Sequence, residues 1–340
     1  MLSFIKSIFN YSLIFGVICV IIIGCTGHKQ TKVTSSSLDS ISRIPDPAAR
    51  IVVLDKYIKS SPATAPLYFL KAKAYDETGS LDSAVKYAGM AIDKDTTQAA
   101  WYFYMSDVFM EKPSVKNAIG ILKRLAVRQP RNKEVWIKIG ELQVKSGEVD
   151  ESIKNLETAL KIDRNSPDAY FWLGYEYREK KENDRAIIGF EKAVELKPDY
   201  EQAYVVLGLL YSDKKDPKAI EYYSSALRLN PHDTAAIYDK GKYYQDIDSF
   251  QRAIDEYDKV IALSADNRDA NYGIAYCLFH LKKYDDALGY FSKVLMKNQY
   301  DSGAHYGRGL CYKGLGQYDK WRKETNIAEG LETKQKKSDD

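Results

Sequence analysis

A period of 34 residues constrains this chain more than any other feature of its sequence. Units of that length begin at residues 65, 99, 133, 167, 201, 234, 268 and 302, and only the step after 201 is one residue shorter. The eighth residue of every unit is small: Ala72, Ser106, Gly140, Gly174, Gly208, Gly241, Ala275 and Gly309. Repetition of this kind predicts a stack of similar units, each packed mainly on its neighbours, rather than one globular core.

The unit from 167 to 200 shows the pattern most clearly. Positions 4, 7, 8 and 11 share one face of a first helix, helix A, and carry Tyr170, Leu173, Gly174 and Tyr177. Positions 20, 24 and 27 share one face of a second helix, helix B, and carry Ala186, Phe190 and Ala193. Small residues at positions 8 and 20 allow the two helices to cross closely. Pro198 ends the unit because proline cannot continue a helix.

This spacing resembles the tetratricopeptide repeat (TPR), a helix–turn–helix unit of the same length. The resemblance covers residues 65–335 and implies an all-α fold, a right-handed α-solenoid of about eight TPR units. Glycines at position 15 of three units, Gly79, Gly147 and Gly316, are expected to supply a positive φ between helices A and B. In the shortened unit, Asp216-Pro217 predicts a helix B that begins one residue early.

The segments that flank the array differ from it. Residues 46–64 are expected to form an N-terminal capping helix, with Asp46 as its N-cap and Pro47 in its first turn. The last unit departs from the pattern at Trp321 and Thr325, as expected of a terminal repeat with one free face. The end of the charged C-terminal tail, residues 336–340, is expected to be disordered.

The N-terminus has the features of an export signal followed by a lipid-attachment site. Residues 1–24 carry a single charge and an apolar run whose length suits a signal peptide. The sequence IIGC that ends at Cys25 resembles a bacterial lipobox, which implies cleavage before Cys25 and attachment of diacylglyceryl and palmitate-type acyl chains to it. The alternative is an uncleaved transmembrane helix over residues 7–27.

The residue after Cys25 is threonine rather than aspartate. By resemblance to enteric lipoproteins, this favours the outer membrane, with the periplasmic or surface face left open. Residues 25–45 are polar, rich in Ser and Thr, and without helical periodicity, so a flexible tether is expected between lipid and fold.

No motif in the chain predicts catalysis. The four histidines, His28, His232, His280 and His305, do not pair at a metal-ligand spacing, and no glycine-rich loop follows a strand. The formal charge of +3 is small and mixed along the chain, which lacks the basic footprint of a nucleic-acid-binding protein. We therefore expect no enzymatic activity, no metal ion, no cofactor and no nucleic-acid partner.

Two cysteines, Cys277 and Cys311, occupy position 10 of successive A helices. Stacked helices lie about 8–10 Å apart, whereas a disulfide needs Cα atoms within about 7 Å. Two free, half-buried thiols are favoured over a disulfide.

An apolar or aromatic residue stands at position 5 of every unit, and several more stand at position 9. The TPR resemblance implies that positions 2, 5, 9, 12 and 13 line the concave groove. The candidate protein-binding residues are Phe69, Phe103, Phe171, Tyr175, Tyr238, Tyr272, Tyr276 and Tyr306. They form either a ladder that receives a peptide or amphipathic helix, or an intramolecular packing layer between neighbouring A helices.

The sequence thus predicts a non-catalytic scaffold in the cell envelope, anchored to a membrane through lipidated Cys25 and binding one or more envelope proteins in its groove. Surface glycan binding by the aromatic ladder is the alternative, because tyrosine faces stack on sugars. A third possibility places binding on the convex side or on the atypical last unit. The Lys and Asn clamp with which some TPR domains bind acidic C-termini is absent, because position 5 is apolar throughout.

Overall fold

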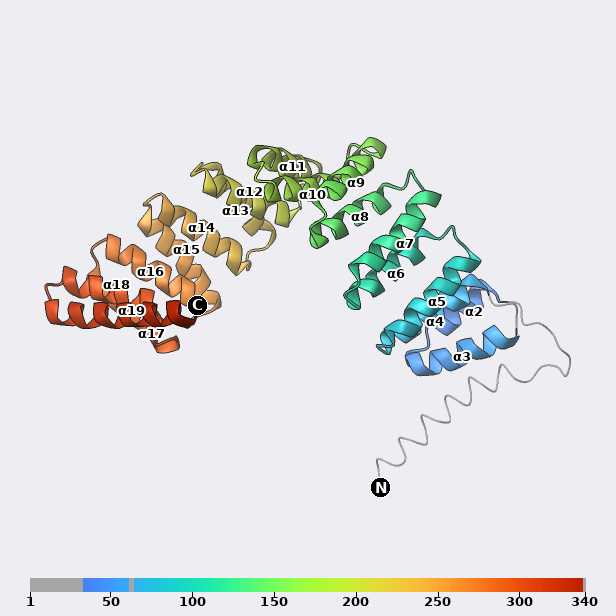
Figure 1. Cartoon of the computed structure of the whole chain (residues 1–340), viewed down its shortest axis with the longest axis horizontal. Helices are drawn as coiled ribbons and strands as arrows, with labels where there is room; N and C mark the ends of the chain where they lie inside the picture. The colour runs from blue at the N-terminus through green and yellow to red at the C-terminus, as the bar shows by residue number, and fades with distance from the viewer. Residues whose placement is uncertain (1–32, 61–63, 339–340) are drawn as a thin grey trace, which may run out of the picture. The chain divides into compact units, whose positions relative to one another are not determined.

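The structure is a computed structural model that describes residues 33–60 and 64–338 of the 340-residue chain. Within these two ranges all regular secondary structure is helical, from α2 to α19 (Figure 1). The chain divides into two compact units, one up to Pro130 and one from Arg131, and each is described by itself.

The first unit holds two flanking helices and two hairpins. Its helices are α2 (Ser35–Ser42), α3 (Pro47–Ser60), α4 (Ala65–Glu77), α5 (Leu81–Lys94), α6 (Ala99–Glu111) and α7 (Val115–Arg128). Asp46 caps α3 as expected, because its carboxylate accepts hydrogen bonds from the N–H groups of Ala48 (3.2 Å) and Ala49 (3.1 Å). Repeat 1 is α4 with α5, and repeat 2 is α6 with α7.

The second unit holds six further hairpins, repeats 3 to 8, stacked in chain order (Figure 1). Its A helices are α8 (Lys133–Ser146), α10 (Pro167–Glu179), α12 (Glu201–Asp213), α14 (Thr234–Asp246), α16 (Arg268–His280) and α18 (Ser302–Gly314). Its B helices are α9 (Val149–Ile162), α11 (Asn183–Leu196), α13 (Lys218–Leu229), α15 (Phe250–Leu263), α17 (Tyr284–Lys297) and α19 (Tyr318–Ser338). The predicted all-α solenoid is confirmed, and every A helix of both units begins at the residue where the 34-residue period starts.

Each hairpin is held by a close crossing of helix A and helix B. A Cβ atom added to Gly208 would lie 2.6 Å from the ring of Tyr223, and one added to Gly174 would lie 2.9 Å from the ring of Phe190. Both rings are fully buried. The small residue at position 8 therefore makes room for the large residue at position 24, as the sequence pattern predicted.

The turn between helices A and B has a left-handed residue at position 15 in seven of the eight repeats, and repeat 2 has Pro113 there instead. Gly79, Gly147 and Gly316 have φ of 74°, 75° and 74°. The same position in repeats 4 to 7 is left-handed without glycine, at Lys181, Lys215, Asp248 and Lys282. A non-glycine residue is strained in this conformation, so these four repeats keep the turn geometry at a cost in backbone energy.

Three expectations about helix boundaries need correction. Helix α2 lies inside the segment 25–45 that was expected to be a flexible tether. Thr34 and Ser37 form a capping box at its start, and Ile41 packs with Leu54 and Leu67. The sequence pattern missed this helix because it offers only one short apolar face.

The other two corrections concern B helices. Helix α13 does not begin early: it starts at Lys218 and has 12 residues, against 14 in α11 and α15. Helix B of this repeat is thus two residues shorter, and in the turn before it Asp216 accepts a hydrogen bond from the N–H of Lys218 (2.9 Å). Helix α19 continues to Ser338, into the tail expected to be disordered.

The thiols of Cys277 and Cys311 are free, as predicted, but they are fully buried rather than half-buried. Burial raises the pKa of each thiol to about 12, so both are poor nucleophiles at neutral pH.

Among the helices between residues 33 and 338, none is long and apolar enough to cross a membrane. The predicted signal peptide and the lipid site at Cys25 lie outside the described residues.

The turn geometry yields a stability prediction within one hairpin. We expect Gly79→Ala to lower the free energy of unfolding by about 1 kcal/mol, because alanine is strained at positive φ. Gly89→Ala is the matched control: it lies inside α5, and a Cβ atom at either glycine meets no atom within 4 Å. This control is expected to raise the free energy of unfolding by up to about 1 kcal/mol, because glycine disfavours a helix interior. Urea unfolding followed by circular dichroism measures both, and equal effects would contradict the assignment of strain to residue 79.

Candidate protein-binding surface

Helices A and B form two different faces of the second unit. Neighbouring A helices contact each other in four places: α8 with α10, α12 with α14, α14 with α16, and α16 with α18. Neighbouring B helices of this unit do not contact each other as extensively. The A helices are therefore closely spaced on an inner face, here called the A face, and the B helices spread apart on the outer face. A partner on the A face would meet side chains from several repeats at once.

In the first unit, the candidate residues are partly used in packing. Phe69 is half-buried, stacks on Trp101 at 5.3 Å and meets the edge of Tyr104 at 5.1 Å between ring centroids. The hydroxyl of Tyr104 in turn donates to Asp76 (3.0 Å). Phe103 is also half-buried. These contacts match the intramolecular alternative considered from the sequence.

In repeat 4, Phe171 belongs to the core. Its side chain is 6% exposed and stacks on Tyr200 at 4.7 Å, with Phe190 at 5.5 Å on another side. Phe171 is therefore removed from the candidate surface. Tyr175 is half-buried, and the guanidinium of Arg178 lies 4.5 Å from its ring centroid.

Tyr238 and Tyr272 are intermediate cases. Tyr238 packs on Tyr257 at 5.4 Å, and Tyr272 meets the edge of Phe291 at 5.5 Å. Burial is the main cause that raises the pKa of both hydroxyls, which keeps them neutral hydrogen-bonding groups at physiological pH. Each ring thus presents only part of its surface to solvent.

Tyr276 and Tyr306 are the candidates whose rings are exposed to solvent. Tyr276 is 36% exposed and Tyr306 is 52% exposed, on A helices that contact each other. The ring of Tyr276 lies 4.3 Å from the ring of His280, which stacks on Phe250 at 4.9 Å. We call Phe250, Tyr276, His280 and Tyr306 the aromatic patch.

Two members of the aromatic patch were not among the predicted binding residues. His280 occupies position 13, which the TPR resemblance places in the groove, so the repeat frame contained a signal for it. Phe250 is the first residue of α15, a B helix, and only the fold brings it beside the end of α16.

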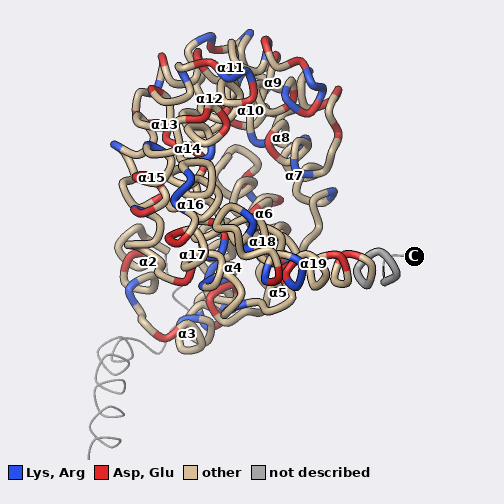
Figure 2. Tube along the Cα trace, turned by 90° about the vertical axis from the view of Figure 1, so that its left-hand side faces the viewer, with Lys and Arg blue, Asp and Glu red and all other residues tan. Residues whose placement is uncertain are grey.

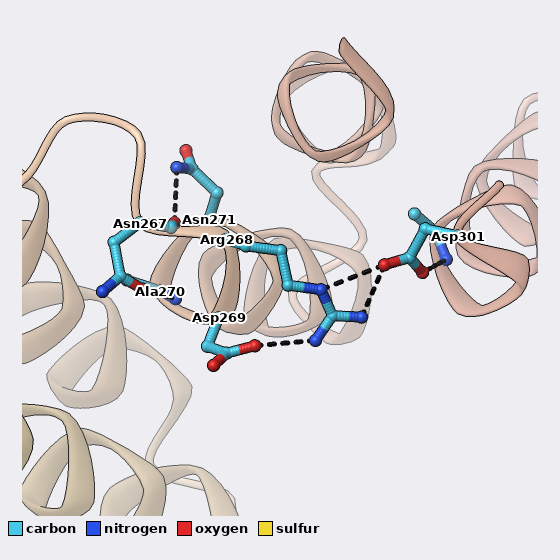
Figure 3. A network of polar contacts seen from close by, with 7 residues as sticks. Asn267, Arg268, Asp269, Ala270, Asn271 and Asp301 are labelled. Carbon is cyan, nitrogen blue, oxygen red and sulfur yellow. Dashed lines mark hydrogen bonds and ion pairs between the residues drawn. The ribbon is translucent and has the colours of Figure 1, made fainter. Parts of the chain in front are cut away.

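A polar network fixes the start of α16, at the other end of this helix from His280 (Figure 3). Arg268 donates to Asp301 through Nε (3.0 Å) and Nη2 (2.6 Å), and to Asp269 through Nη1 (2.7 Å). The hydrogen bond to Asp269 has the largest effect on the guanidinium. Together with the hydrogen bonds to Asp301 it outweighs desolvation and raises the pKa of Arg268. Asp301 also caps α18 by accepting from the N–H of Ala304 (2.9 Å). Because the Arg268 guanidinium lies 5.2 Å from the ring centroid of Tyr272, the network also restrains that ring.

The distribution of charged residues does not favour a strongly acidic or a strongly basic partner. Figure 2 shows basic and acidic residues interspersed along the described trace. No group of three or more His, Cys, Asp or Glu residues suited to hold a metal ion occurs in the part of the chain that the structure describes.

These features define an α-helical repeat protein built from helix–turn–helix hairpins. Family models for the tetratricopeptide repeat match residues 238–302, residues 140–175, and residues 65–92, 167–200 and 201–233. Together the matched segments span more than half of the chain, which therefore belongs to the TPR family. No curated protein sequence matches it.

Two solved structures agree on the fold, and a third is more similar in sequence. The C-terminal part of a TPR repeat-containing protein from Cytophaga hutchinsonii is 21% identical, with a TM-score of 0.50 over 80% of this chain and 98% of that one. YrrB, a TPR protein with an unusual peptide-binding site, is 21% identical, with a TM-score of 0.50 over 54% of this chain and 95% of that one. MamA is 28% identical over 48% of this chain and 97% of that one, with a TM-score of 0.46.

The network around Asp301 yields a second prediction. Asp301→Asn keeps a capping oxygen but loses the charge that faces Arg268, whereas Asp301→Ala loses both. We expect the alanine variant to unfold with a free energy about 1 kcal/mol lower than the asparagine variant, because a lost N-cap costs about that much.

Asp233 offers a matched comparison, because it caps α14 through the N–H groups of Ala235 (3.0 Å) and Ala236 (3.1 Å). Urea titrations should show a larger loss for Asp301→Ala than for Asp233→Ala. Equal losses would mean that the contact with Arg268 adds nothing to stability.

Proposed function

We propose that this chain is a non-catalytic scaffold of the bacterial cell envelope, which binds a segment of a partner protein on the A face of repeats 6 to 8. TPR arrays are in general protein-interaction scaffolds, and the fold supports that coarse assignment. The aromatic patch carries the finer proposal. Its residues lie on helices held rigidly by stacked hairpins, and two of its tyrosine rings are open to solvent.

The chemistry of the aromatic patch suits a peptide or an amphipathic helix. Tyrosine offers a large apolar ring and a polar hydroxyl with little conformational entropy to lose, and it is enriched at binding hot spots. Tyr276, His280 and Phe250 already contact one another, so much of the cost of ordering them is met before a partner arrives. Tyr238 and Tyr272 would form the half-buried edge of the same surface.

Glycan binding is the second candidate, and the same observation supports it. The open ring faces of Tyr276 and Tyr306 are also the groups on which a sugar would stack. The two functions differ in their partner and are separated by the experiment below.

Membrane anchoring through Cys25 completes the proposal. Its support is the lipobox-like sequence that ends at this cysteine. Several acyl chains on one residue give stable attachment, because each buried methylene contributes about 0.8 kcal/mol. The threonine that follows favours the outer membrane. Anchoring would concentrate bound partners near the membrane without any change in their intrinsic affinity.

Photo-crosslinking in cells tests the location of the partner surface. A photoreactive residue at position 306 is expected to capture one discrete protein, because Tyr306 is more exposed than Tyr276. The matched probe at position 188 is expected to capture none. Ile188 lies on α11, a B helix, and is 65% exposed.

If position 188 captured the same protein and position 306 did not, binding would take place on the outer face formed by the B helices. If neither captured a protein while the purified chain bound polysaccharides, the scaffold proposal would give way to glycan binding.

Metabolic labelling with an alkyne-tagged fatty acid tests the anchor. We expect label on the full chain and none on a Cys25→Ser variant, which should also leave the membrane fraction. Cys19→Ser is the matched control and should label normally, because Cys19 belongs to the segment expected to be cleaved off. Unchanged labelling of Cys25→Ser would overturn lipidation at this residue.

A further inference from the structure

A cavity on the B-helix side of repeat 7 is not used by the proposed function. Its volume is about 490 Å³, and it opens between α15 and α17 above α16. We call it the α15–α17 notch. Its floor is apolar and consists of Ile254, Ile274 and Leu278, which are at most 8% exposed. The wall contributed by α17 consists of Asp285, Asp286, Gly289, Tyr290 and Lys293.

Repeats 4, 5, 6 and 8 fill the equivalent place with a pair of their own side chains. A tyrosine at position 11 of helix A lies under a cation on helix B, which directly precedes the repeated alanine in repeats 4 to 6 and Trp321 in repeat 8. The distances from the cation to the ring centroid are 3.9 Å for Arg185 on Tyr177, 5.2 Å for Lys218 on Tyr211, 5.9 Å for Arg252 on Tyr244, and 5.2 Å for Lys320 on Tyr312. Each pair combines ring packing with cation–π attraction.

Repeat 7 lacks both members of this pair. Leucine replaces the tyrosine at position 11, as Leu278, and aspartate replaces the cation, as Asp286. Leucine is smaller than tyrosine, and an aspartate cannot attract a ring face as a cation does. Gly289 adds further room, because a Cβ atom placed there meets nothing within 4 Å. The volume that remains lies within the range of about 300–1,000 Å³ typical of ligand pockets.

The charge at the notch is the reverse of that in the filled repeats. Asp285 and Asp286 are exposed on its wall. Burial and then the carboxylate of Asp258 on α15 raise the pKa of Tyr290, which lines the same notch. Burial and then the Asp255 carboxylate raise the pKa of Asp258. Lys293 is the cation of the lining, and its ammonium lies 4.2 Å from the ring centroid of Tyr290. The notch therefore combines an apolar floor with a wall on which carboxylates outnumber the ammonium group.

We propose that the α15–α17 notch is a second binding site, which receives a large aromatic or apolar side chain and a neighbouring Lys or Arg from a partner protein. The partner would supply the ring and the cation that repeat 7 lacks. Its apolar side chain would cover Ile274 and Leu278, and its cation would face Asp285 and Asp286. This site is independent of the aromatic patch, because it opens between B helices.

Binding of small dipeptides to the full chain tests the proposal. The probe is N-acetyl-tyrosyl-arginine amide, and the matched probes are the tyrosyl-glutamate and alanyl-arginine amides. Titration followed by ligand-observed NMR is expected to show saturable binding of the tyrosyl-arginine probe. Each matched probe should bind at least about tenfold more weakly, a difference of about 1.4 kcal/mol. Absence of saturable binding, or equal binding of the glutamate probe, would overturn the proposal.

Two variants localise the site. Gly289→Leu should fill the notch while favouring the α17 helix. It is expected to weaken binding of the tyrosyl-arginine probe at least about tenfold. Gly330→Leu on α19, where a Cβ atom also meets nothing within 4 Å, is the matched control and should bind normally. Unchanged binding in Gly289→Leu, with helix content retained by circular dichroism, would place the probe elsewhere and refute the notch.

A third variant has a readout that does not depend on any ligand. The double substitution Leu278→Tyr with Asp286→Arg restores the pair found in repeats 4, 5, 6 and 8. It is expected to abolish dipeptide binding and to raise the midpoint of thermal unfolding. A lower midpoint together with unchanged binding would show that the notch is not the counterpart of the filled sites.

Discussion

The close crossing of helix A and helix B inside each hairpin is the constraint on which the rest of the structure depends. Gly208 under Tyr223 and Gly174 under Phe190 show its form, a position without Cβ that receives a buried ring. Burying such a ring stabilises the chain by about 2–3 kcal/mol, and the ring fits where the opposite helix carries a small residue. Each hairpin still leaves one apolar face uncovered, so the next hairpin must stack on it.

Because this crossing is the same in successive repeats, the remaining positions are free to differ. On the A face, position 5 is a core residue at Phe171 and an open ring at Tyr306. On the B side, the tyrosine and cation that close repeats 4, 5, 6 and 8 are replaced in repeat 7 by Leu278 and Asp286. Function in such an array is carried by departures from the repeat, since only these distinguish one part of the surface from another.

The sequence predicted the fold more completely than the site. The period placed the start of every A helix, and glycine at position 15 marked three of the left-handed turns. It did not reveal the left-handed turn at Lys181, because a lysine carries no sign of its backbone conformation. Helix α2 and the shortened α13 were also missed, because α2 depends on the packing of Ile41, and the start of α13 follows the turn at Asp216 and Pro217.

By itself the sequence determined the repeat, its register and the residues able to face a partner, because helical periodicity and side-chain size act within one hairpin. Only the tertiary structure decided which of those residues remain accessible. Phe171 is buried by Tyr200 from the connection to the next repeat, and Tyr276 is joined by Phe250 from another helix. The α15–α17 notch likewise exists only between hairpins. Exposure depends on how neighbouring units stack, and that stacking is a property of pairs of repeats rather than of any single segment of sequence.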